Sequence, residues 1–226
     1  MHTILQEFRY ALSQLRKSSG FALVSVLTLA LGIGANIAVF SVTNAVLLNP
    51  SGIPHADGLV ALRARYNAMP DLSNISLSAP DFADAAEGKN IFSSAAVMQG
   101  GSFNYARENS NPELLNGASV SSGWFDTFDV RPYPGRVFTP EEDQPGAGND
   151  AVLSYRTWQK RFGSDPNIAG QTLMLNNQAF RVVGVTGPSF NWPNQAELWV
   201  PIAFPPARYH DPNYRNNENL FGVARL

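Results

Sequence analysis

Residues 151–185 read AVLSYRTWQKRFGSDPNIAGQTLMLNNQAFRVVGV, and this stretch combines strand, helix and hairpin signals. Its first three residues are apolar and predict a short buried strand. A helix follows, with Trp158 and Phe162 one turn apart on one face and Gly163 as its stop signal. Two apolar runs around Asn176-Asn177 then predict a β-hairpin. A strand, a helix and a hairpin in succession indicate an α+β domain.

Further helix and strand signals precede this stretch. Alternating apolar and polar residues predict a half-buried strand over 60–66. Ser78 and Asp81 have the spacing of a capping box at the start of a helix that ends at Gly88. The segment SSGWFDTFDV at 121–130 predicts a short helix that buries its aromatic side chains. We therefore expect a mixed domain over 51–226, without internal repeats.

The composition excludes several classes of function. The chain has 226 residues, with 16 basic and 18 acidic side chains, so it is nearly neutral. No basic patch is interleaved with aromatic residues, and nucleic acid is therefore not an expected partner. The sequence contains no cysteine, which excludes disulfides, thiolate zinc sites and a cysteine nucleophile.

A long uncharged run precedes the domain. No charged residue occurs from Ser18 to Pro54, and the strongly apolar part, 21–48, exceeds the roughly 20 residues that a helix needs to cross a bilayer. We therefore predict one transmembrane helix within 18–50. The alternative is a cleaved signal peptide, with Gly32-Ile33-Gly34 as its cleavage site. Because the apolar character continues well past that site, an uncleaved span is favoured.

Residues 1–17, MHTILQEFRYALSQLRK, have the pattern of an amphipathic helix. Its apolar side chains fall in an arc of about 120° on a helical projection, which suits a helix lying on a bilayer surface. The basic residues on this side of the span favour a cytoplasmic amino terminus and an extracytoplasmic domain. An ordinary surface helix of a soluble domain is the alternative. The residues predicted for the membrane surface are Ile4, Leu5, Phe8, Arg9, Leu12, Leu15, Arg16 and Lys17.

Small and polar residues interrupt the apolar run in two sets. Four of them fall within about 40° of one another on a helical projection, and a small-xxx-small pair lies on another face. Small residues let helices approach closely in lipid, and a side-chain amide is costly there without a partner. We therefore predict packing against other transmembrane helices, of a longer protein or of a second copy; a lone anchor is the alternative. The first set is Ser25, Gly32, Asn36 and Thr43, and the pair is Gly34 and Ala38.

The search for reactive chemistry gives no candidate. The GxGxxA spacing at 146–151 precedes a strand instead of following one, so it is interpreted as a loop. No GxxxxGK[ST] motif or GxSxG elbow occurs, and the three histidines are scattered. The acidic run 141–143 is interpreted as a solvated turn rather than a metal site. We therefore predict no catalytic residue, no cofactor and no metal.

Several segments resemble MacB-like and FtsX-like ABC-type permeases. LTLALGIGANIAVFSVTNAVLL at 27–48 looks like their first transmembrane helix. VSSGWFDTFDVRPYPGRVFTPEED at 120–143, the stretch 151–185 and ELWVPI at 197–202 resemble their periplasmic core domain. The amphipathic start looks most like the duplicated permeases described from acidobacteria. Such permeases have further spans after this domain, so the ending at 221–226 resembles a strand cut short.

The resemblance implies a mechanical function in a bacterial inner membrane. ATP bound by a separate cytoplasmic ATPase would move the membrane helices, and these would reshape a periplasmic domain that expels or hands on a substrate. The domain would have two lobes, one from about 56–118 and 190–226 and the other, inserted, from about 119–185. The implied partners are the lipid bilayer, the other transmembrane helices of the permease or of a dimer partner, and the ATPase subunit.

Two readings from other classes remain open. A membrane-anchored binding or adhesion module would need no helix partners and would work as a single-span chain. An exported enzyme on a signal anchor would need a convergent set of titratable groups, and the sequence offers none.

Overall fold

The computed structural model describes residues 17–43, 53, 56–66, 71, 73–87, 91–107, 111–193 and 195–226. Residue contacts divide the chain into two units, 1–52 and 53–226. The amphipathic helix predicted over 1–17 lies outside the described residues except for Lys17, and residues 44–50 of the predicted span also lie outside them.

The first unit contains one long apolar helix, α2 (Ser19–Thr43). Residues 19–41 are long and apolar enough to cross a membrane by length and composition alone, a test that a signal sequence also passes. At about 1.5 Å per residue the helix is about 37 Å long, which exceeds a hydrocarbon core of about 30 Å. Its described side chains are almost all exposed within this chain, as expected for a helix whose solvent is lipid.

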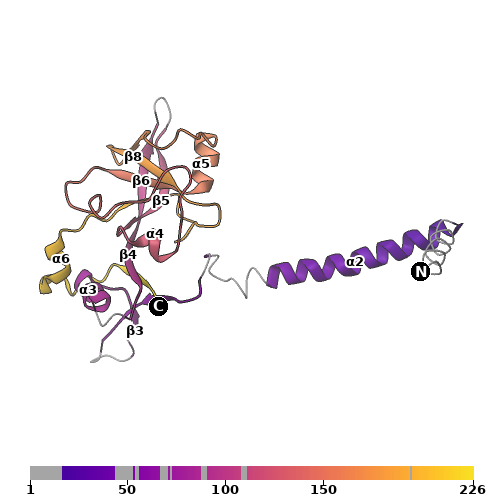
Figure 1. Cartoon of the computed structure of the whole chain (residues 1–226), viewed down its shortest axis with the longest axis horizontal. Helices are drawn as coiled ribbons and strands as arrows, with labels where there is room; N and C mark the ends of the chain where they lie inside the picture. Colours follow the sequence, from indigo (N-terminus) through magenta and orange to yellow (C-terminus); the bar gives the residue numbers. More distant parts are fainter. Residues whose placement is uncertain are drawn as a thin grey trace, which may run out of the picture. The chain divides into compact units, whose positions relative to one another are not determined.

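The second unit is built on an eight-stranded sheet with the order β1-β10-β4-β5-β9-β6-β8-β7. Figure 1 labels β4, β5, β6 and β8 of this sheet. The pairs β5–β9 and β6–β8 are parallel and the others are antiparallel. A separate two-stranded sheet pairs β2 with β3. The strands are β1 (Leu59–Leu62), β2 (Ala64–Arg65), β3 (Ser73–Ile75), β4 (Ser94–Ala106), β5 (Glu113–Val120), β6 (Asp150–Leu153), β7 (Thr172–Leu175), β8 (Gln178–Val185), β9 (Leu198–Pro201) and β10 (Phe221–Arg225).

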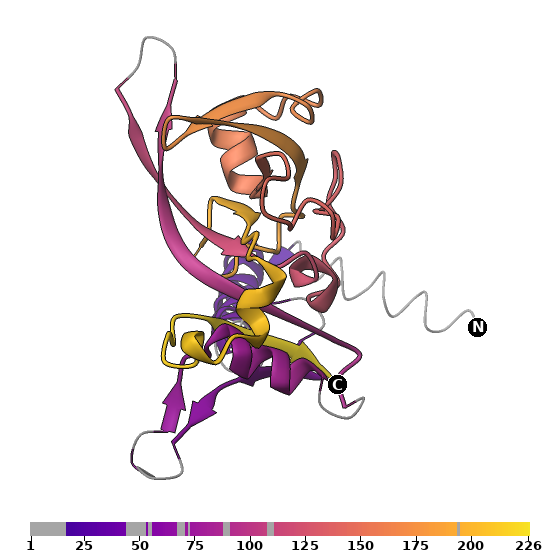
Figure 2. The same cartoon turned by 90° about the vertical axis from the view of Figure 1, so that its left-hand side faces the viewer.

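The long strand β4 belongs to two parts of this sheet. Its first residues pair with β10, its middle pairs with β5, and Tyr105 and Ala106 at its end pair with β7. The last pairing closes β4, β5, β9, β6, β8 and β7 into a six-stranded barrel. Figure 2 shows β4 as a long bent ribbon that runs from the part with α3 to the part with α5.

Five short helices accompany the sheets in the described part of this unit. They are α3 (Ala79–Glu87), α4 (Trp124–Thr127), α5 (Tyr155–Phe162), α6 (Pro206–His210) and the 3-10 helix η2 (Pro212–Tyr214). The predicted capping box is confirmed, because the amide of Asp81 donates to Ser78 Oγ at 3.2 Å and the Asp81 carboxylate accepts from Ser78. Gly163 ends α5 in the left-handed conformation, as predicted. Gly88 lies outside the described residues.

Three hydrophobic clusters hold the domain together. The first gathers aromatic side chains from α4 and the residue after it (Trp124, Phe125 and Phe128), from β9 and from Phe190, and so contains aromatic residues predicted to be buried over 121–130. The second fills the barrel and packs against Trp158 and Phe162 of α5. The third lies at α3, around Leu77 and Leu220. The chain therefore has a mixed α and β core, as its helix and strand signals predict.

The strand predicted over 60–66 is divided into two strands in the structure. Its alternation of half-buried and exposed residues is observed from Val60 to Arg65, but the chain forms two strands, β1 and β2. Leu62 pairs with Gly222 in the large sheet, whereas Ala64 pairs with Ile75 in the small one. The run breaks at Arg63 because its two halves belong to different sheets. The hairpin at Asn176-Asn177 is confirmed, with both residues at positive φ.

Candidate functional site

The first candidate site is the surface of α2. Ser25, Gly32 and Asn36 lie in this helix, and a Cβ added to Gly32 would meet no atom within 4 Å. Gly34 and Ala38 lie in the same helix and are likewise exposed. Thr43 is the last residue of α2. Because the described residues include no second apolar helix, the packing role of these six residues stays a prediction.

The polar side chains of α2 differ in their hydrogen bonding. Thr28 Oγ1 donates to the carbonyl oxygen of Val24 at 2.8 Å, so this hydroxyl is satisfied within the helix. The amide of Asn36 has no hydrogen-bond partner among the residues that the structure describes. An amide in hydrocarbon without a partner is unfavourable, so Asn36 is the side chain of this helix that most needs a neighbour.

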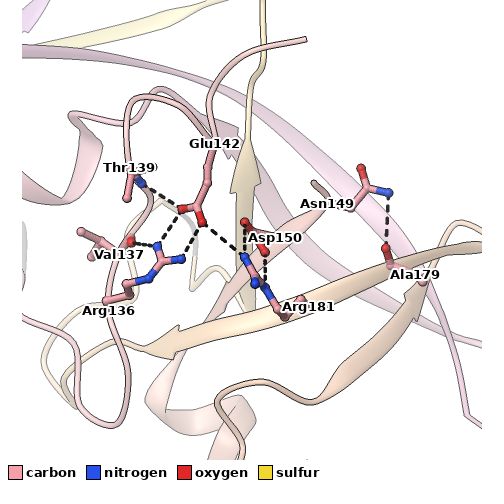
Figure 3. A network of polar contacts seen from close by, with 8 residues as sticks. All are labelled: Arg136, Val137, Thr139, Glu142, Asn149, Asp150, Ala179 and Arg181. Carbon is pink, nitrogen blue, oxygen red and sulfur yellow. Dashed lines mark hydrogen bonds and ion pairs between the residues drawn. The ribbon is translucent and has the colours of Figure 1, made fainter. Parts of the chain in front are cut away.

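The second candidate is a network of charged side chains on the barrel (Figure 3). Arg181 on β8 holds Asp150 on β6 with two hydrogen bonds, from Nε at 2.9 Å and from Nη2 at 3.1 Å. Glu142 accepts two hydrogen bonds from Arg136, at 2.5 and 2.7 Å, and a longer one from Arg181 at 3.3 Å. The amide of Thr139 also donates to Glu142 at 3.0 Å. The network ties the loop 136–149 to the barrel wall.

Backbone packing positions this network. Gly135 forms an isolated β-bridge with Gly184, and a Cβ on Gly184 would lie 2.2 Å from the carbonyl oxygen of Arg136. Only a residue without a side chain allows the loop to run this close to β8. The register of β6 and β8 places Asp150 opposite Arg181. These contacts place Arg136 and Arg181 on either side of Glu142, where both can donate to it.

The network lowers the pKa of Glu142 below its ordinary value. Hydrogen bonds from Arg136 and from the Thr139 amide lower the pKa of Glu142 to about 2, against the opposing effect of burial. The Asp150 carboxylate is only 2% exposed, and its charge is matched by Arg181. Every charged member of the network has an opposite charge as neighbour. The network of Arg136, Glu142, Asp150 and Arg181 therefore stabilises the fold, and it is called the brace below. None of its groups is poised for proton transfer.

We expect this brace to weaken in acid. Because the pKa of Glu142 is lower in the folded chain than in the unfolded one, its contribution is complete above about pH 4.5 and is lost as the pH falls toward 2. The Arg partners are about half exposed, which reduces the contribution to about 1–2 kcal/mol. Urea unfolding of the wild type and of Glu142→Gln should show this gap at pH 6 and a much smaller gap at pH 2.5. A gap that does not depend on pH would contradict the assignment.

The structure corrects the interpretation of the acidic run 141–143 as a solvated turn, because two of its three carboxylates are engaged within the domain. Glu141 is exposed, but Glu142 belongs to the brace, and Asp143 accepts hydrogen bonds from the amides of Ser122 and Ala203, each at 2.8 Å. Burial raises the pKa of Asp143, although these amides oppose the shift. Local sequence could not reveal this, since Ser122 and Ala203 are far away in the chain. No group of three potential metal ligands occurs among the described residues.

Comparisons with known proteins identify the family. Residues 22–224 match the family model described as MacB-like periplasmic core domain. A comparison with curated proteins finds no match.

Three solved structures share the fold. A domain of a permease protein from Porphyromonas gingivalis is 16% identical, with a TM-score of 0.58 and 77% of each chain covered. The periplasmic region of MacB from Actinobacillus actinomycetemcomitans is 19% identical, with a TM-score of 0.54 over 80% of this chain and 79% of that one. The extracellular domain of the noncanonic ABC-type transporter YknZ from Gram-positive bacteria is 15% identical, with a TM-score of 0.50 over 74% and 82%.

Proposed function

The chain belongs to the family of MacB-like periplasmic core domains, and we therefore propose that it is part of the permease of an ABC-type transporter. The observation that carries the proposal is the family match over 22–224, which begins inside α2 and extends through the domain. The structural neighbours support it, since their names are those of a permease, MacB and an ABC-type transporter.

The proposed mechanism is mechanical. A separate cytoplasmic ATPase would bind ATP, and its movement would reach the extracytoplasmic domain through α2 and neighbouring membrane helices. Support comes from the sequence, which has no phosphate-binding loop of its own. The chain itself would need no cofactor, perform no covalent chemistry and bind no nucleic acid.

We also propose the division of the domain into two lobes. Residues 56–118 and 190–226 would form one lobe and residues 119–185 the inserted one. The cluster around Leu77 and Leu220 draws only on the first set of residues. The barrel cluster draws on both sets, so β4, β5 and β9 would connect the lobes.

The proposed location is a bacterial inner membrane, with the amino terminus in the cytoplasm. A reporter that is active only in the periplasm should therefore work when it is fused after Leu226 and fail when it is fused after Lys17. The basic residues beside the span support this orientation. Recovery of a mature chain that begins near Ala35 would instead establish a cleaved signal peptide.

The packing surface of α2 gives the direct test of a permease helix. Gly32→Leu should hold two helix backbones apart, and Asn36→Leu should remove an interhelical hydrogen bond worth about 0.6–2 kcal/mol in membranes. Transport by the full permease should fall in both variants while the amount of protein in the membrane stays constant. The measurement is a transport or resistance assay normalised to membrane protein.

Leu23→Ile, on a different face of α2, serves as the control and should change neither quantity. Unchanged transport in both Gly32→Leu and Asn36→Leu would favour the single-span binding or adhesion module over the permease.

A further inference from the structure

An open cleft of about 680 Å³ lies beside α5. It is lined by residues 154–157, 160 and 161, by residues 188, 190, 191 and 195–197, and by Asn116. Its volume falls in the range of about 300–1,000 Å³ that is typical of ligand sites in proteins. The cleft shares no lining residue with the charged network described above, so that network does not account for it.

A second, smaller cleft of about 220 Å³ adjoins the first. The two clefts share Lys160 and Arg161, and the second adds Arg107 to the lining. Arg156 lines the first cleft only. Cationic side chains therefore continue from one cleft into the next, which suits an extended ligand with more than one negative charge.

The positive charge of this region is only partly matched within the chain. Arg161 binds both carboxylates of the clefts, Glu113 and Glu197. The other oxygen of Glu197 accepts from the amide of Asn116 at 3.0 Å. Both carboxylates are thus already engaged and leave the remaining cations uncompensated.

Arg156 and Lys160 are the uncompensated cations of the larger cleft. Arg156 donates to the neutral amide oxygen of Gln195 at 3.2 Å, and both cations are exposed. Within the described ranges, no carboxylate lies within ion-pair distance of either side chain. The first turn of α5, with its positive dipole end, adds to the positive potential.

The rest of the lining indicates the type of anion. The side-chain amides of Asn116, Asn191 and Gln195 can each donate and accept hydrogen bonds, which suits the N–H and C=O groups of a peptide. A uniform polyanion such as a polyphosphate presents only acceptors and would leave the donor and acceptor pairs of these amides half used. We propose that the two clefts bind an acidic peptide segment of a partner protein, with Arg156 and Lys160 pairing with its carboxylates.

Binding of a model peptide tests this proposal. A dye-labelled peptide with four consecutive glutamates is titrated with the full chain in zwitterionic detergent, followed by fluorescence anisotropy. It should bind at least about tenfold more tightly than the same peptide with four glutamines, and the double variant Arg156→Gln, Lys160→Gln should weaken its binding by about tenfold or more. The affinity should also fall as salt is added.

A charge-matched control separates the cleft from general attraction. The variant Arg65→Gln, Arg131→Gln removes two cations elsewhere, including the 91% exposed Arg131, and should bind the glutamate peptide like the wild type. Equal losses in both double variants, or no preference for glutamate, would overturn the proposal. Displacement by about 10 mM phosphate, but not by sodium chloride of the same ionic strength, would assign the clefts to a small oxyanion instead. None of these results depends on transport, so the test stands apart from that of α2.

Discussion

Replacement of Arg181 by leucine is expected to lower the free energy of unfolding clearly, because it leaves the buried carboxylate of Asp150 without its partner. The Asp150 side chain is 2% exposed, and Arg181 supplies both of the close hydrogen bonds to its two oxygens. The measurement is urea unfolding of the full chain in detergent, followed by circular dichroism.

Two further variants make this prediction specific. Asp150→Asn removes the buried charge, so Arg181→Leu should cost much less in that background than in the wild type. Arg131→Leu removes an arginine that is 91% exposed and lies 3.8 Å from Asp129, and it should change the stability by less than about 0.5 kcal/mol. Equal effects of Arg181→Leu and Arg131→Leu would show that the brace does not stabilise the barrel.

Replacement of Trp199 by alanine is expected to cost about 3–5 kcal/mol, the range for large side chains removed from a packed core. Trp199 on β9 is fully buried, and its ring centroid lies 5.7 Å from that of Phe125 and 5.4 Å from that of Phe190. Its indole nitrogen donates to the carbonyl oxygen of Trp192 at 3.2 Å. The variant therefore loses aromatic contacts and a hydrogen bond, and it leaves a cavity.

Tyr133→Ala is the control for aromatic truncation, because Tyr133 is 84% exposed. Unfolding in urea should place it within about 0.5 kcal/mol of the wild type. A loss below about 1 kcal/mol in Trp199→Ala would mean that the aromatic cluster can repack around the missing ring.

Short-range signals predicted much of the secondary structure. Ser78 and Asp81 form the capping box that their spacing indicates, Gly163 ends α5, and Asn176-Asn177 form the turn of the hairpin. Each signal depends on residues within a few positions of one another, and the backbone interactions that they favour form in almost any tertiary context. The apolar run likewise predicted α2, because its length and composition suffice to indicate a long apolar helix.

These local elements, the apolar helix and the family resemblance can all be predicted from short stretches of sequence. Long-range strand pairing, by contrast, places β4 in two parts of the large sheet, closes the barrel through β7 and divides the strand over 60–66 at Arg63. Tertiary packing also brings Asp150 to Arg181 and gathers Arg156 and Lys160 into one cleft with residues 190, 191 and 195–197. The physical reason is that these contacts join residues tens of positions apart, and their geometry follows from strand register and packing, which no local pattern encodes.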